Sequence, residues 1–413
     1  MSGRRMAAVD AQFYWMSAKI PSDEFLLYAF DGELADPDRA VAQVLGRAAA
    51  CPALSVRVRD GCSLTYPQWV PAPVGSEQVV RHAVPGGTWA GCLTAVAGLG
   101  DQQLDLRRTP WLLHVFTPVF GIPGVDRPGT VAVLQLPHAL ADGARGTAMA
   151  SWLFGRAAPV PEVRRPRPGC FGWRAVQAAR AHRTLVRDTR AGLLAAGVGS
   201  RPPVATNTRP QGARSVRTLV RHRTQLAGPT VTIGVLAAVS GALSGLLDSA
   251  PPSLGAEVPM VKPGARQANN HFGNAVVGLY PDLAPEVRME RIRTDLSNAR
   301  RRFEHPATRS AGQAFAAVPA PLLRWGISQF DADARPTEVL GNTVLSSVNR
   351  GAADLRFGGA RVVLTAGYPA LSPAMSLTHG VHGIGETIAI SVHAAESAVG
   401  DIDAYVELLA AAL

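Results

Sequence analysis

Short apolar runs and longer amphipathic segments alternate along the chain. Runs rich in branched residues predict strands over residues 25–30, 55–59, 131–136, 343–348, 360–365 and 387–393. Apolar positions at helical spacing, or good helix formers, predict helices over residues 36–50, 93–98, 144–154, 171–194, 232–247 and 287–303. Because both halves of the chain mix the two patterns, we predict an α/β protein made of two lobes, each a two-layer sandwich.

A segment of different composition separates the two halves. Residues 158–169 and 199–211 are rich in proline and arginine, which is typical of linkers. At 413 residues the chain also exceeds one ordinary hydrophobic core. We therefore expect an N-terminal lobe over residues 1–155, an arginine-rich crossover over residues 156–212 and a C-terminal lobe over residues 213–413.

The positive charge of the chain is concentrated in that crossover. The net charge is +10, and fifteen arginines lie between Arg156 and Arg223 against only Glu162 and Asp188. Such a segment can contact nucleic acid, an anionic membrane surface or the phosphates of a cofactor. Aromatic residues for base stacking are scarce there, which disfavours nucleic acid as a partner. The helix expected over residues 171–194 has the form of a membrane-surface helix or of a crossover between lobes, and its small apolar content favours the crossover.

Three further patterns bear on the cellular compartment. The uncharged segment 228–247 is nearly long enough to span a membrane, but its glycine, serine and threonine content favours a buried helix. Four cysteines without C-x-x-C spacing indicate reduced thiols and no structural zinc site. The first ten residues lack the apolar core of a signal peptide, so a cytoplasmic location is expected.

The strongest candidate for chemistry follows the apolar run at residues 131–136. Pro137 ends the predicted strand, which places His138 on a loop, and Asp142 stands where the next helix needs an N-cap. A neutral imidazole can act as a general base near pH 7 if its ring is held in place. Asp142 could orient the ring directly, or could hold the loop by pairing with an arginine elsewhere. Gly143 would leave room for a substrate.

Several segments together resemble one family, the bacterial wax ester synthases and acyl-CoA:diacylglycerol acyltransferases (WS/DGAT). It lies within the CoA-dependent acyltransferases, which include condensation domains. The residues that carry the resemblance are Ala8–Trp15 with its D-x-x-F-x-W pattern, Leu104–Asp105 with Thr109–Trp111, Pro137–Gly143 with its H-x-x-x-D-G pattern, Val235–Leu247, His271–Asn274 and Phe357–Val362.

The resemblance implies two chloramphenicol-acetyltransferase-like lobes with the active site at their interface. It implies transfer of a long-chain fatty acyl group from acyl-CoA, the co-substrate, to diacylglycerol or a long-chain alcohol, without a metal or a tightly bound cofactor. His138 corresponds to the general base, and Asp142 to an aspartate that maintains the geometry of the site. Since the family uses insoluble substrates, we also predict peripheral contact of the arginine-rich segment with a membrane or lipid-droplet surface.

The second half departs from the family pattern, where Thr232–Ile233, Ser346–Gly351 and Gly380–Gly383 replace the usual motifs. An alternative is therefore a catalytically degenerate member that binds a lipid or a partner protein. A metal site on His379, His382 and His393 is a further hypothesis. Two features disfavour it: the segment around His379 looks like a glycine-rich loop, and no recognised pattern of carboxylate ligands accompanies the histidines.

Overall fold

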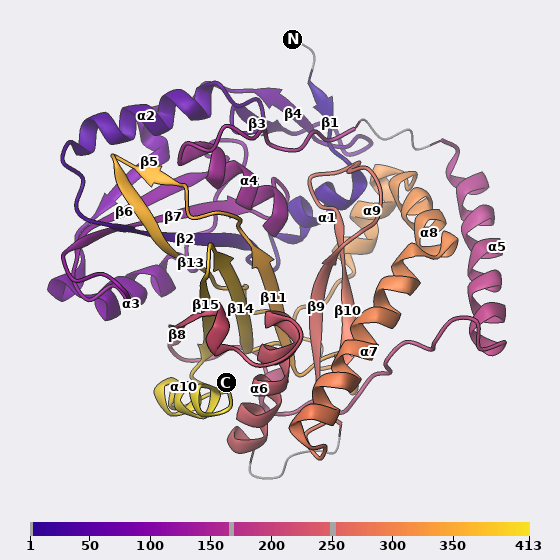
Figure 1. Cartoon of the computed structure of the whole chain (residues 1–413). Helices are drawn as coiled ribbons and strands as arrows, with labels where there is room; N and C mark the ends of the chain where they lie inside the picture. The colour runs from indigo at the N-terminus through magenta and orange to yellow at the C-terminus, as the bar shows by residue number, and fades with distance from the viewer. Residues whose placement is uncertain (1–2, 165–168, 248–252) are drawn as a thin grey trace.

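Two six-stranded sheets, one in each lobe, organise the fold (Figure 1). The computed structural model describes residues 3–164, 169–247 and 253–413. Part of the predicted linker, residues 165–168, lies outside the described residues. The mixed α/β class and the two-lobe architecture predicted from the sequence are confirmed.

The first sheet lies in the N-terminal lobe and carries the strand that leads to His138. Its order is β12 (Arg356–Phe357), β13 (Ala360–Gly367), β2 (Asp23–Asp31), β7 (Gly129–Pro137), β6 (Leu112–Val119) and β5 (Val79–His82). Every residue of the central strand β7 is buried, as its continuous apolar run predicts. Helices α2 (Pro37–Ala49) and α4 (Gly143–Leu153) pack on one face, and α3 (Trp89–Leu99) packs on the other. Beside this lobe, β1 (Arg4–Arg5), β4 (Gln68–Pro71) and β3 (Val56–Arg59) form a small sheet.

The second sheet belongs to the C-terminal lobe. Its order is β10 (Phe272–Gly278), β9 (Gly255–Val261), β11 (Thr343–Asn349), β14 (Leu377–Ile384), β15 (Thr387–Ala395) and β8 (Arg214–His222). Helices α6 (Val231–Leu246), α7 (Pro285–Glu304) and α10 (Ile402–Ala411) contribute to its apolar core. The segment considered as a membrane span forms α6, which is largely buried in this core. Within the described residues, every helix is too short or too polar to cross a membrane.

The C-terminal half of the chain contributes two strands to the first sheet. Strands β12 and β13 come late in the chain, yet β13 pairs antiparallel with β2 in the first sheet. The division at residues 155 and 212 stays a prediction, and residues 356–367 contribute to the sheet of the other lobe. Strand β14 follows directly and returns the chain to the second sheet.

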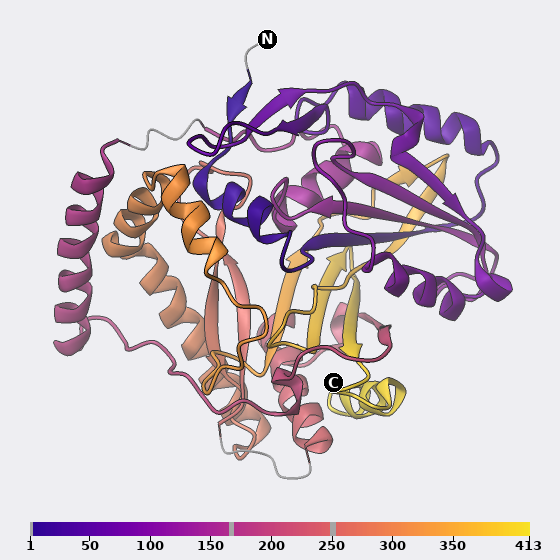
Figure 2. The same ribbon diagram turned by 180° about the vertical axis from the view of Figure 1, so that it is seen from behind.

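Three peripheral helices, α5 (Phe171–Arg190), α8 (Pro306–Ala316) and α9 (Ala320–Ser328), lie beside the two lobes, and two of them contact the N-terminal helix. Helix α1 (Ala8–Met16) contacts both α8 and α9. Helix α5 is the arginine-rich crossover and packs against α8 at the edge of the molecule (Figures 1 and 2). It ends four residues before the predicted boundary, because Gly192 adopts φ 72° just beyond the C-cap and stops the helix.

Candidate active site

His138 stands on the turn that joins β7 to α4. Its neighbour Pro137 is the last residue of β7 and pairs with Asp23 of β2. The backbone N–H of Leu140 donates to the carbonyl of Pro137, which closes the turn. Asp142 is the N-cap of α4 and accepts a hydrogen bond of 2.9 Å from the backbone N–H of Arg145. The loop, the cap and the helix predicted here are all present.

Two aromatic rings from distant elements pack against the His138 imidazole. Phe13 of α1 stacks on it with ring centroids 4.1 Å apart, and Phe272 of β10 stacks at 5.5 Å. The ring is therefore fixed in plane by residues of both halves of the chain. Burial lowers the pKa of His138, because an apolar surrounding disfavours the charged ring. The imidazole is neutral near pH 7 and able to accept a proton.

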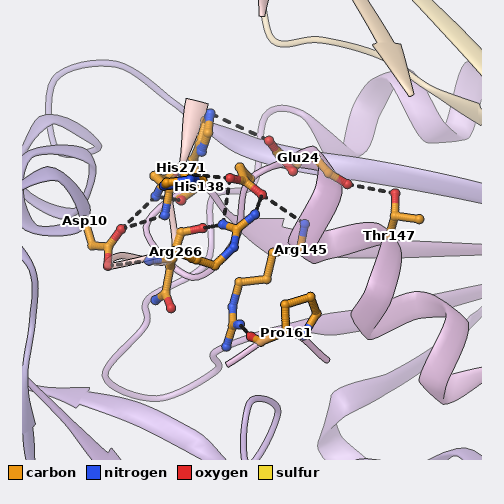
Figure 3. Close-up of polar contacts among 12 residues, drawn as sticks. Asp10, Glu24, His138, Arg145, Thr147, Pro161, Arg266 and His271 are labelled. Atoms are coloured by element: carbon orange, nitrogen blue, oxygen red, sulfur yellow. Dashed lines mark hydrogen bonds and ion pairs between the residues drawn. The ribbon is translucent and has the colours of Figure 1, made fainter. Parts of the chain in front are cut away.

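Asp142 does not lie against the His138 ring but pairs with an arginine from the other lobe. Arg266 donates two hydrogen bonds to its carboxylate, at 2.8 and 3.2 Å, and the backbone N–H of His271 donates a third at 2.8 Å (Figure 3). Burial favours the neutral acid, but the hydrogen bonds and positive charge of Arg266 hold the pKa of Asp142 below its usual value. Of the two arrangements that the sequence left open, the structure has the arginine pair.

A loop at residues 266–271 attaches the second lobe to the catalytic turn, and the sequence reasoning did not identify it. The Asn270 side chain donates to the carbonyl of His138 at 2.7 Å and to the Asp10 carboxylate at 3.0 Å. The Asn269 side chain donates to the carbonyl of Ala139 at 3.1 Å. Asp10 also accepts from both asparagine backbone N–H groups, and its burial raises its pKa to about 6. Only the fold reveals these contacts, although Asp10 lies in the D-x-x-F-x-W segment.

Gly143 opens α4 and faces the second lobe. A Cβ atom at this position would meet Val348 of β11 at 3.5 Å, an ordinary van der Waals separation. The glycine thus lies where α4 and β11 approach each other. Its role in admitting a substrate stays a prediction.

A cavity of about 800 Å³ gives access to His138. Its lining combines residues of α1, the loop at 103–107 and α9, and it includes Phe13, Trp15, Asp23, His138 and Trp325. A second cavity of about 140 Å³ shares Lys19, Asp23 and Gln103 with the first. Space for a bulky substrate therefore lies between segments from the two halves of the chain.

The prediction of a glycine-rich loop around His379 is wrong, because these residues form the buried strand β14. His379 hydrogen-bonds through Nδ1 with Thr343 Oγ1 at 2.8 Å and through Nε2 with the Tyr405 hydroxyl at 2.9 Å. His393 hydrogen-bonds with the carbonyl of Pro369. Among the described residues, His, Cys, Asp and Glu side chains nowhere gather in a group of three suited to a metal ion. The metal hypothesis is therefore unsupported.

Comparisons with known proteins identify the class. A search of curated protein sequences finds no significant match. Residues 268–413 match the profile of the WS/DGAT C-terminal domain. Among solved structures, the chain is similar to the wax ester synthase/diacylglycerol acyltransferase from Marinobacter aquaeolei VT8, with 17% identity, a TM-score of 0.64 and coverage of 99% of this chain and 97% of that one.

Condensation domains share the same architecture. A variant of the starter condensation domain of rhizomide synthetase RzmA, solved in complex with C8-CoA and Leu-SNAC, is 12% identical with a TM-score of 0.61. The alignment covers 99% of this chain and 93% of that one. At these identities the likeness concerns the two-lobe fold.

The fold and the C-terminal domain together define an acyltransferase. More particularly, the chain carries the WS/DGAT C-terminal domain, and the resemblance to the WS/DGAT family predicted from the sequence is confirmed.

Proposed function

We propose that the chain transfers a long-chain fatty acyl group from acyl-CoA to the hydroxyl of diacylglycerol or a long-chain alcohol, with His138 as general base. The observation that carries the proposal is a neutral histidine, stacked against two aromatic rings, on the wall of a large cavity in a WS/DGAT-type acyltransferase. Two structurally similar proteins support it, since one is a wax ester synthase/diacylglycerol acyltransferase and the other was solved in complex with C8-CoA.

The reaction needs a base and alignment more than it needs activation, because a thioester is already reactive. His138 accepts the proton of the acceptor hydroxyl, and the oxygen attacks the thioester carbonyl to form a tetrahedral intermediate. The C–S bond then breaks, and the CoA thiolate takes the proton from the imidazolium. Asp142 and Arg266 act on this chemistry indirectly by holding the turn that carries His138.

The test is product identification with purified protein. We expect labelled palmitoyl-CoA to give an ester with one member of a panel of diacylglycerol, long-chain alcohols and short alcohols. His138→Ala is expected to reduce the rate about a hundredfold or more, since a general base typically contributes that much. His222→Ala, at an exposed position at the end of β8, serves as the matched control and should keep the wild-type rate. Equal turnover of the His138 variant and wild type would contradict the assignment and favour the degenerate alternative.

We also propose that α5 makes peripheral contact with an anionic lipid surface. None of its residues is buried, it carries five arginines, and Trp173 is 57% exposed. Cationic side chains beside an exposed aromatic ring suit the interface of an anionic membrane.

Vesicle sedimentation tests this contact. Binding to vesicles with phosphatidylserine should exceed binding to neutral vesicles and should fall with added salt. Arg180→Glu with Arg183→Glu should weaken binding, whereas the same charge change at Arg300 and Arg301 of α7 should not. Binding that ignores both lipid charge and the α5 substitutions would refute the proposal.

A further inference from the structure

A second ionisable side chain, Glu24, faces the proton-accepting atom of His138. Strand β2 pairs with β7 so that Glu24 lies opposite Leu136, two residues before the histidine. Its Oε1 lies 3.6 Å from His138 Nε2 (Figure 3). Its Oε2 is buried without a hydrogen-bond partner among the described residues. A buried carboxyl oxygen without a donor disfavours the charged carboxylate, so the contacts of Oε2 favour the neutral acid.

The groups around Glu24 keep its carboxyl neutral. Burial disfavours ionisation, and the negative charges of Asp142 before α4 and Asp23 on β2 add to that effect. Arg350 at the end of β11 opposes it, but the pKa of Glu24 is still raised to about 8. The carboxyl also lies close to α4, because a Cβ at Gly146 would come within 3.6 Å of Oε2. Near pH 7 the Glu24 hydroxyl is therefore available as a donor.

The separation of the two groups fits one oxygen atom between them. At 3.6 Å, Glu24 and His138 are too far apart for a direct hydrogen bond. A third atom can nevertheless lie within about 2.8 Å of both. We propose that the neutral Glu24 carboxyl donates a hydrogen bond to the oxygen of the acceptor hydroxyl while that hydroxyl gives its proton to His138 Nε2.

This contact rests on the proposed function and refines its first step. The hydroxyl proton moves to Nε2, the new C–O bond forms at the thioester carbon, and the thiolate later takes the proton from the imidazolium. Glu24 keeps its own proton throughout and orients the acceptor. An ionised Glu24 could only accept, so it would draw the hydroxyl proton away from His138. The contact selects an acceptor that presents a hydroxyl oxygen.

Acyl transfer from palmitoyl-CoA to decanol, followed between pH 6.5 and 9.5, tests the contact. For wild type we expect the rate to fall above about pH 8, approaching tenfold per pH unit as Glu24 ionises. Glu24→Gln donates at any pH, so it should lose this alkaline fall at the cost of a few-fold lower rate at pH 7. Glu24→Ala should raise the KM for decanol about tenfold. Glu33→Gln, an exposed carboxyl just after the same strand, should keep the wild-type profile. An alkaline fall shared by wild type and Glu24→Gln, or an unchanged decanol KM in Glu24→Ala, would overturn the proposal.

Decanol binding, read from tryptophan fluorescence, separates this proposal from the proposed function. Trp15 and Trp325 line the cavity and report on its occupation. We expect the Kd for decanol to rise about tenfold in Glu24→Ala at pH 7, and to rise from pH 7 to pH 9 in wild type but not in Glu24→Gln. If wild type makes no ester but shows this binding pattern, acyl transfer fails while the Glu24 contact stands. Binding that is the same in all variants and at both pH values would overturn the contact.

Discussion

The Asn270 side chain links three parts of the site that come from different regions of the sequence. It joins the carbonyl of His138, the Asp10 carboxylate and the loop of the second lobe. Two acceptors, one of them a buried carboxylate, each receive a hydrogen bond from this one amide group. The position of His138 thus depends on a residue that takes no part in proton transfer.

Asn270→Ala should therefore affect both stability and turnover. We expect a loss of about 1–3 kcal/mol in the free energy of unfolding, because the carbonyl of His138 and one Asp10 oxygen lose a donor. The rate of acyl transfer should fall about tenfold to a hundredfold as the turn relaxes. Urea unfolding and ester formation measure the two effects. Asn274→Ala, an exposed asparagine on β10, is the matched control and should change the stability by less than about 0.5 kcal/mol. Equal behaviour of the two variants would show that the Asn270 contacts do not matter.

The sequence revealed the local part of the site but not the distant part. His138 and Asp142 lie four residues apart after an apolar run, so their spacing alone suggested a catalytic turn. Arg266 and Asn270 reach the turn from 124 and 132 residues away in the chain. Glu24 lies one residue before the predicted strand at residues 25–30, and nothing in its sequence context indicated a role. Contacts of this kind depend on the pairing of β2 with β7 and on the docking of the second lobe, which periodicity does not encode.

At the level of elements, the sequence pattern predicted six of the ten helices and six of the fifteen strands of the described residues, and β14 is among the strands that it missed. Gly380 and Gly383 suggested a loop, whereas they belong to a buried strand. The reason is a close approach of two backbones: a Cβ at Gly380 would lie 2.2 Å from the carbonyl oxygen of Gly367, the last residue of β13. Gly380 is needed because any side chain would collide with the backbone of the neighbouring strand. A single sequence does not distinguish a glycine of this kind from a glycine in a turn.

His379, which is buried on β14, makes this strand sensitive to acid. Burial lowers the pKa of His379 to about 3, while the unfolded chain takes up a proton near pH 6.5. Between these values the unfolded state binds more protons, so the stabilising contribution of neutral His379 is lost as the pH falls from 6.5 towards 3. The slope is about 1.4 kcal/mol per pH unit for one such group.

His379→Asn should remove that share of the pH dependence. Urea unfolding between pH 6 and 4.5 is expected to show a shallower loss of stability than in wild type, by about 1.4 kcal/mol per pH unit, whatever the variant loses at neutral pH. His182→Asn, on the exposed surface of α5, should keep the wild-type slope. Parallel curves for His379→Asn and wild type would mean that His379 is not neutral in the folded protein.

At the scale of the whole molecule, β13 ties the lobes together. It pairs with β2 of the first sheet, and the next strand, β14, is central in the second. The loop at residues 266–271 adds polar contacts from the second lobe to the turn of His138. Each lobe therefore packs against residues that the other half of the chain supplies. The same contacts position the active site, and we expect them to make the two lobes unfold together.

Leu364→Ala tests this coupling. Leu364 is fully buried on β13, in the apolar cluster between the first sheet and α3, and its truncation should cost about 2–5 kcal/mol. If the lobes unfold as one unit, calorimetry will show a single transition that moves to lower temperature, with equal calorimetric and van't Hoff enthalpies. Leu64→Ala, at a position 72% exposed, should leave the transition in place. Two transitions, of which only one moves, would show that β13 stabilises the lobe of the first sheet alone. The site at the interface would then form from two independently folding parts.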